Sequence, residues 1–157
     1  MRETGLYLKN SEGSFTYRVG AFIIQDGKLL TAKSMYYPCF YTVGGVVEMN
    51  ETSQEAVVRE VLEETGFKLE IDRLFCVQER IFTLGEQRHH EINLFYLMKT
   101  TEDFHVSDQT YTDQAPEETL HWIPLKDIPN VDIVPESLKS FHYDDLSGIT
   151  HIVSRES

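Results

Sequence analysis

The chain has 157 residues, of which 41% are hydrophobic and 25% charged, and its formal net charge is −12 at pH 7. This length predicts a single domain, residues 1–157, that is large enough to bury a core without disulfide or metal staples. The acidic balance argues against binding to DNA or to a membrane surface, and the two cysteines without a disulfide framework favour a reduced, cytoplasmic setting.

The first predicted elements form a β-hairpin. Residues 16–25 have the pattern of a strand, Asp26 and Gly27 form a typical two-residue turn, and residues 28–34 return as the second strand. An aromatic-rich stretch, residues 36–43, then leads into the double glycine at positions 44 and 45.

A helix is predicted over residues 52–65. Thr52 and Glu55 have the spacing of a capping box at its start, and Gly66 supplies a left-handed residue at its end. The elements expected after it are strands near residues 67–83 (interrupted), 91–100 and 119–123, a helical segment over residues 135–143, and a short last strand at residues 149–153. Strands before and after a central helix predict an α+β sandwich.

Three glutamates of this helix share one face. Successive helical residues advance by about 100°, so Glu63 lies near −60° and Glu64 near +40° from Glu60. The neighbouring arc is apolar and is predicted to be buried; it contains Val57, Val58, Val61 and Leu62. The acidic stripe therefore borders the core.

An acidic helix face is most often a solvated surface. Here the like charges repel each other one turn apart, and carboxylate oxygens are the hard ligands that Mg²⁺ or Mn²⁺ prefers. The full spacing is more specific than the triplet, because seven fixed residues recur by chance on the order of once in a million chains of this length. Those residues are Gly45, Glu51, Arg59, Glu60, Glu63, Glu64 and Gly66.

Residues 45–67 resemble a complete Nudix box. The resemblance implies an α/β/α sandwich with a mixed central sheet, in which the box forms a loop-helix-loop. It also implies Mg²⁺- or Mn²⁺-dependent hydrolysis of a phosphoanhydride bond in a nucleoside diphosphate linked to another moiety. The roles that it implies are metal binding by Glu60, Glu63, Glu64 and the Gly45 carbonyl, an outer-shell or water-mediated contact by Glu51, and orientation of the carboxylates by Arg59.

The general base in such an enzyme is either a box glutamate or a glutamate from a downstream loop. Glu102, Glu117 and Glu118 are the downstream candidates, and each could equally be an ordinary surface residue. Glu117, just before the strand that leads to Trp122, is the base that we predict.

Candidate substrate-binding residues lie upstream of the box. Tyr36 and Tyr41 could stack on a base, although such rings more often pack in a core or at its rim. Lys33, at the end of the second strand, is the third candidate. The proline that marks many ADP-ribose hydrolases some fifteen residues past the box is absent, since that region reads Arg-Ile-Phe-Thr at residues 80–83.

Two other functions compete with a hydrolase. A ligand sensor with this fold usually lacks box glutamates and is fused to a basic DNA-binding module, whereas the box here is intact and no basic module is present. A relative of isopentenyl-diphosphate isomerase needs a catalytic cysteine in a context that Cys39 does not provide. Members of the family are often dimers, so a homodimer is a further expectation, whereas no apolar run approaches the length of a membrane span.

Overall fold

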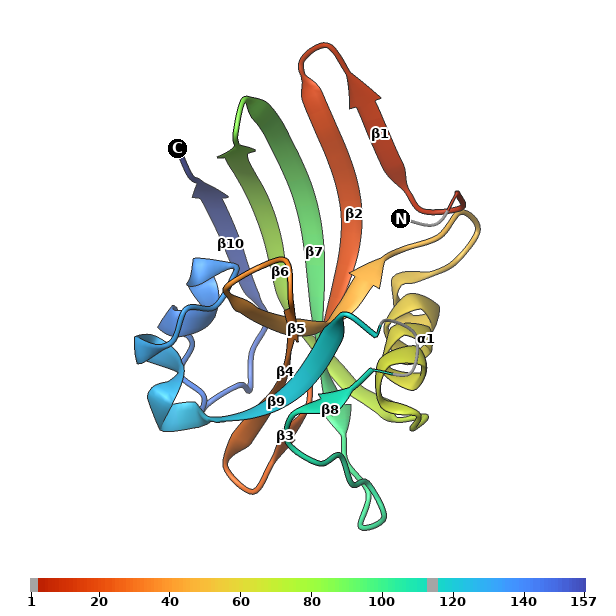
Figure 1. Ribbon diagram of the computed structural model, residues 1–157, viewed down its shortest axis with the longest axis vertical. Helices are drawn as coiled ribbons and strands as arrows, with labels where there is room; N and C mark the ends of the chain where they lie inside the picture. The colour runs from red at the N-terminus through yellow and green to blue at the C-terminus, as the bar shows by residue number, and fades with distance from the viewer. Residues whose placement is uncertain (1–2, 113–115) are drawn as a thin grey trace.

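The computed structural model describes residues 3–112 and 116–157, which form a strongly curved mixed sheet with helical segments on both sides (Figure 1). The helical elements are α1 (Ser53–Thr65) and two 3-10 helices, η1 (Leu125–Asn130) and η2 (Glu136–Ser140). The strands are β1 (Tyr7–Asn10), β2 (Gly13–Phe22), β3 (Ile24–Gln25), β4 (Lys28–Ser34), β5 (Phe40–Val46), β6 (Glu70–Leu84), β7 (Gln87–Lys99), β8 (Thr110–Tyr111), β9 (Glu118–Pro124) and β10 (Thr150–Arg155).

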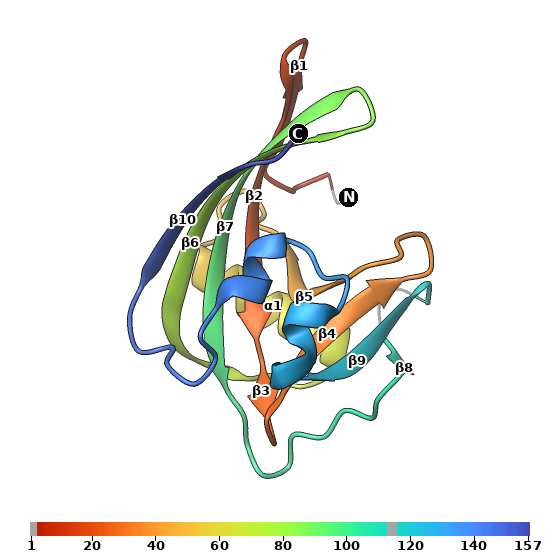
Figure 2. The ribbon, with the colours of Figure 1, turned by 90° about the vertical axis from the view of Figure 1, so that its left-hand side faces the viewer.

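The strand order is β10-β6-β7-β2-β5-β4-β9-β8, with β1 paired to β2 and β3 paired to β4. The pairs β2–β7 and β6–β10 are parallel, and the other pairs are antiparallel. Figure 2 shows how the long strands β6 and β7, with β10 beside β6, curve away from β4 and β9. The sheet is therefore mixed, as expected.

Local signals in the sequence are confirmed at the hairpin and at the helix ends. Asp26 and Gly27 have φ values of 52° and 71°, and the turn joins the paired residues Gln25 and Lys28. Thr52 and Glu55 form both hydrogen bonds of the capping box, and Gly66 ends α1 with a φ of 80°. These features depend on only a few neighbouring residues, which is why the sequence predicts them well.

Helix α1 packs one face against β2 and β5. Val57 and Val61 are fully buried, and Val58 is half-buried against the same core cluster. Leu62, which was expected in the buried arc, is 44% exposed, so that part of the prediction was wrong. Its position at about 200° from Glu60 places it at the far end of the arc, at the edge of the side that faces the sheet.

Other elements differ from the prediction. β1 was not foreseen, and β7 begins at Gln87 rather than at residue 91. Within residues 135–143 only Glu136–Ser140 is helical, and it is a 3-10 helix, after which Phe141 returns to extended backbone. β10 is the predicted last strand, and it pairs with β6 in parallel.

Two hydrophobic clusters occupy the two faces of the sheet. The first joins α1 to β2, β4, β5, β7 and β9, and its members include Val19, Val43 and Tyr96. The second joins η1 and η2 to the opposite face, with Phe22, Phe75 and Phe95 among its members. This layering is the predicted α/β/α sandwich, and the α+β class is confirmed.

No helix in the described part of the chain is long and apolar enough to span a membrane.

Candidate active site

The double glycine lies at the end of β5, where that strand pairs with β2. Gly44 is opposite Gly20, and Gly45 is opposite Val19. A Cβ at Gly44 would lie 2.2 Å from the Val19 carbonyl oxygen, and its φ of 155° is unfavourable for other residues. Glycine here allows a close approach of two backbones, and it leaves the backbone of the loop open toward α1.

Two glutamates of α1 converge on this glycine pair. A Cβ at Gly45 would lie 2.5 Å from Oε1 of Glu60, so the Glu60 carboxylate sits directly over that residue. The backbone N–H of Gly44 donates to Oε1 of Glu64 at 3.4 Å. The carboxylates of Glu60 and Glu64 therefore both lie beside the glycine pair.

Arg59 contacts three of the box carboxylates. Its Nε and Nη2 donate to the two oxygens of Glu51 at 2.6 and 2.9 Å, and its Nη1 donates to Glu60 at 2.8 Å and to Glu63 at 3.4 Å. Glu51 also accepts the backbone N–H of Glu48 at 2.9 Å. The guanidinium thus contacts Glu51, Glu60 and Glu63 together, and its bonds to Glu51 and Glu60 raise its pKa.

Glu64 is the electrostatically unusual residue of the site. Its Oε2 atom is buried and has no hydrogen-bond partner. Burial raises the pKa of its carboxyl well above the usual value, and the negative charges of Glu118 and Glu60 raise it further. The Gly44 N–H and the charge of Arg18 oppose this rise. A buried, incompletely hydrogen-bonded carboxylate among other carboxylates is unfavourable unless a cation joins it.

Glu118, the first residue of β9, is the downstream glutamate that approaches Glu64. The Tyr41 hydroxyl donates to its Oε2 at 2.5 Å. Burial raises the pKa of the Glu118 carboxyl, and the neighbouring Glu117 charge adds to the rise, whereas the bond from Tyr41 lowers it. The side chain of Glu118 therefore belongs to the acidic cluster around Glu64.

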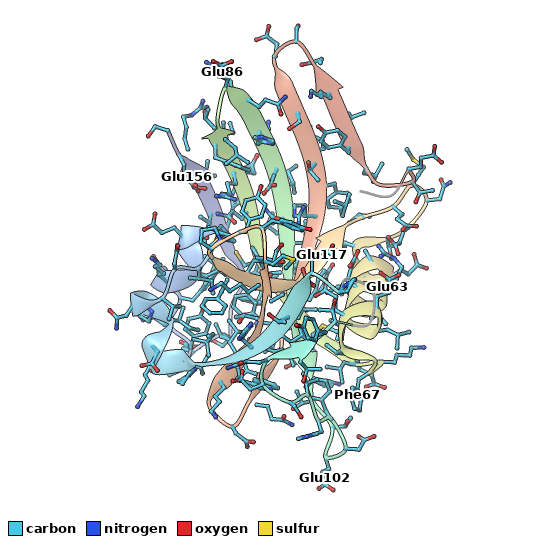
Figure 3. The ribbon with its side chains drawn as sticks, in the orientation of Figure 1. Glu63, Phe67, Glu86, Glu102, Glu117 and Glu156 are labelled. Carbon is cyan, nitrogen blue, oxygen red and sulfur yellow. The ribbon has the colours of Figure 1, made fainter. Side chains whose placement is uncertain are left out.

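Glu117 and Glu102 are placed differently from Glu118. Figure 3 shows Glu117 at the start of β9, whereas Glu102 lies at the tip of the loop after β7, far from Glu63 on α1. Glu117 is exposed, and its backbone carbonyl accepts the N–H of Met35. The described contacts do not bring the Glu117 carboxylate to the box, so its role as the base stays a prediction that the geometry does not favour.

The three candidate substrate-binding residues are also separated. Tyr36 is 76% exposed on the loop between β4 and β5. Tyr41 packs against the first core cluster, and its hydroxyl is used by Glu118 rather than left for a ligand. The ammonium of Lys33 lies 4.8 Å from the centre of the Phe40 ring. Their substrate-binding roles stay predictions.

The donor set fits a divalent cation, although in the described residues no three acidic, His or Cys side chains are already gathered as a ligand group. The unpartnered Oε2 of Glu64 is a hard oxygen without a proton donor, and Glu60 lies on the adjacent glycine. A cation between these oxygens would relieve the repulsion that raises the pKa of Glu64. Arg59 is the group that partly neutralises the other carboxylates.

The alternation of β9 could have distinguished Glu118 from Glu117. Leu120 is buried in the first core cluster and Trp122 packs against it, two residues further on. Residues two apart on a strand share a face, so Glu118 points to the same side as Leu120. Leu120 and Glu64 line one pocket of about 180 Å³, together with His105 and Tyr111. Extending the predicted strand back by one residue would have indicated this placement.

Comparison with known proteins agrees with this geometry. The model of the NUDIX domain matches residues 14–143. A Bacillus subtilis protein named "Putative 8-oxo-dGTP diphosphatase" is 30% identical over 122 residues, 73% of this chain and 74% of that protein. An ADP-ribose pyrophosphatase of Methanocaldococcus jannaschii is 36% identical over 83 residues, 51% of this chain and 48% of the relative, so the match spans about half of that relative.

Among solved structures, a MutT protein from Bacillus halodurans superposes with a TM-score of 0.63 at 14% identity, covering 89% of each chain. At that identity the likeness concerns the fold alone. The domain match covers most of the sequence, and it agrees with the fold and with the glycine pair beside two box glutamates. This chain therefore belongs to the NUDIX family.

Proposed function

We propose that this protein hydrolyses a phosphoanhydride bond in a nucleoside diphosphate linked to another moiety, using Mg²⁺ or Mn²⁺ bound at Gly45, Glu60, Glu63 and Glu64. The main support is the Oε2 atom of Glu64, which is buried without a hydrogen-bond partner beside Glu60 and Glu118. Folding an acidic group into such a place is costly, and binding a cation there offsets the cost.

The named relatives support this class of reaction. The Methanocaldococcus jannaschii relative is named as an ADP-ribose pyrophosphatase, and the Bacillus subtilis relative carries the name of an 8-oxo-dGTP diphosphatase. Both names describe cleavage of a phosphoanhydride in a nucleotide. They supply the two first substrates to test.

A metal ion bound at this site would neutralise the diphosphate and lower the pKa of a coordinated water. Arg59 keeps Glu51, Glu60 and Glu63 in place through its hydrogen bonds to all three carboxylates. Glu118 is the candidate that accepts a proton from the attacking water, because its carboxylate neighbours Glu64 and is partly withdrawn from solvent. Tyr41 keeps the Glu118 side chain in one orientation by donating to Oε2.

Glu118→Gln is expected to lower kcat by about 10²- to 10⁴-fold, the range that loss of a positioned general base produces. The amide oxygen can still accept the bond from Tyr41, so the fold and the affinity for substrate should be nearly unchanged. The matched control is Glu117→Gln, which removes the same charge one residue away from an exposed position and should change kcat by less than about threefold. Steady-state kinetics on both variants decides, and a large loss in Glu117→Gln with normal Glu118→Gln would restore Glu117 as the base.

The test of the function as a whole is a hydrolysis screen over ADP-ribose, nucleotide sugars, dinucleotides, nucleoside triphosphates and oxidised nucleoside triphosphates. We expect turnover of at least one of them in Mg²⁺ or Mn²⁺ and none in EDTA, with Glu64→Gln as the inactive control. Full activity in Glu64→Gln would mean that the metal site is assigned wrongly. Binding of a nucleotide derivative without any metal-dependent turnover would favour the sensor function instead.

A further inference from the structure

Arg18 is a cation beside the acidic cluster that the proposed mechanism has not used. It lies on β2, between Val46 of β5 and Asn93 of β7 in the register of the sheet. Gly20, two residues further along β2, is opposite Gly44, and side chains two residues apart share a face. The side chain of Arg18 therefore leaves the sheet beside the glycine pair, on the face that carries Phe22 and the second cluster rather than on the face covered by α1.

The guanidinium of Arg18 differs from the other half-buried guanidiniums in residues 3–112 and 116–157, because it makes no hydrogen bond or ion pair with a described residue. Its counterparts have partners in the protein, namely Glu51, Glu60 and Glu63 for Arg59, the carbonyl of Gly148 for Arg73, and Glu156 for Arg80. A partly desolvated cation usually acquires an anionic partner, because hydrogen bonds to its charge replace those lost from water. The partner of Arg18 is thus expected to come from outside the chain.

The charges around Arg18 suggest what that partner is. Its positive charge acts on Glu64, the carboxylate that has an unpartnered buried oxygen. Glu60 and Glu118 add negative charge to the same place, in a protein whose formal net charge is −12. A diphosphate entering here would be repelled by the carboxylates that no metal ion neutralises. A guanidinium at the edge of the cluster would hold such a group, since its fork matches two phosphate oxygens.

We infer that Arg18 binds a phosphate group of the substrate beside the acidic cluster, on the face of the sheet opposite α1. This inference rests on the proposed function, because it assigns a substrate contact to that same site. Arg59 cannot take this part without releasing the carboxylates that it holds. Lys33 is directed onto the Phe40 ring. Arg18 would then set substrate affinity, whereas the glutamates set the rate.

The test uses Arg18→Gln and Arg18→Lys with methylenediphosphonate, a diphosphate analogue whose bridging carbon replaces the oxygen of the scissile bond. Isothermal titration calorimetry in Mg²⁺ should show that Arg18→Gln binds the analogue about 10- to 100-fold more weakly than the wild-type protein. Arg18→Lys, which keeps the charge but loses the fork, should bind about 3- to 10-fold more weakly. The control is Arg88→Gln, an exposed arginine near the β6–β7 turn, and its affinity should be unchanged.

The kinetic signature on a substrate found in the screen should be a raised KM with kcat within about threefold of wild type, since the lost contact is present in ground and transition states alike. If Arg18→Gln binds the analogue as tightly as wild type, the inference is overturned while the hydrolase function stands. If Arg18→Gln does not fold, as judged by circular dichroism, wild-type affinity in Arg18→Lys overturns it instead. Wild-type protein that neither binds the analogue nor turns over any substrate would contradict the proposed function as well.

Discussion

Glu64→Gln should make the metal-free protein more stable and the enzyme inactive. The wild-type Oε2 atom is buried without a partner, and burial together with Glu118 and Glu60 raises the pKa of the carboxyl. A glutamine amide is uncharged, and its N–H groups can donate to the neighbouring carboxylates. We expect a gain of at least about 1 kcal/mol, or about 2–4 °C in Tm, by thermal unfolding in EDTA. Turnover should fall on the order of 100-fold or more, since even outer-shell changes at metal sites cost about 10–100-fold.

The dependence of stability on pH tests the cause of that gain. Because the pKa of Glu64 is higher in the folded state than its usual value of 4.5, the folded state binds more protons than the unfolded state across that interval. The unfolding free energy of the metal-free wild type should therefore fall as pH rises from about 4.5 through the raised pKa. In Glu64→Gln the unfolding free energy should fall less over the same pH range, because the group that causes the fall is gone. If the unfolding free energy of the two proteins depends on pH in the same way, the pKa of Glu64 is not raised by folding.

With Mg²⁺ bound, the wild type should become more stable than Glu64→Gln, the reverse of the order without metal. Saturating Mg²⁺ stabilises the state that binds it, so it should raise the Tm of the wild type. The rise should be smaller in Glu64→Gln, which has lost a ligand oxygen. A control with Glu117→Gln, which alters an exposed carboxylate, should keep the full rise. Equal Mg²⁺-dependent shifts in all three proteins would place the cation elsewhere.

Alanine should lower mainly the stability at Gly44 and mainly the catalytic rate at Gly45. At Gly44 the new Cβ would meet the Val19 carbonyl oxygen at 2.2 Å, and the φ of 155° would be strained. Backbone cannot move aside cheaply, so Gly44→Ala should lose about 3 kcal/mol of stability or more. At Gly45 the Cβ would instead meet the end of the flexible Glu60 side chain at 2.5 Å. Gly45→Ala should fold with a loss below about 1 kcal/mol, yet displace a catalytic carboxylate.

The measurement pairs chemical denaturation with kinetics. For Gly45→Ala we expect kcat to fall on the order of 100-fold, which a displacement of about 1 Å can cause. Gly148→Ala is the control, because a Cβ there meets nothing within 4 Å. A normally active Gly45→Ala protein would contradict the position of Glu60 over the glycine. A stable Gly44→Ala protein would show that β2 and β5 separate more easily than their contact suggests.

Much of the fold could be predicted because its signals are local. The Asp26–Gly27 turn and the Thr52–Glu55 cap each depend on neighbours within a few residues, and both form as expected. Leu62 was predicted wrongly because helical periodicity fixes an angle around the axis and not the extent of the surface opposite it. The helical segment predicted over residues 135–143 is longer than the observed 3-10 helix, Glu136–Ser140. The reason is related, since apolar spacing alone does not determine where a helix ends.

By itself, the sequence determined the family and the acidic face of α1. Spacing along one helix sets the angles of Glu60, Glu63 and Glu64, and those angles do not depend on the remainder of the chain. Only the tertiary structure decided which residues from other strands lie near these carboxylates. The charge of Glu118 acts on Glu64 because β9 alternates its side chains and pairs with β4, whereas the role of Glu117 as the base stays a prediction. Arg18 joins the site through the register of β2 with β5, a pairing between segments far apart in the chain that no short-range pattern specifies.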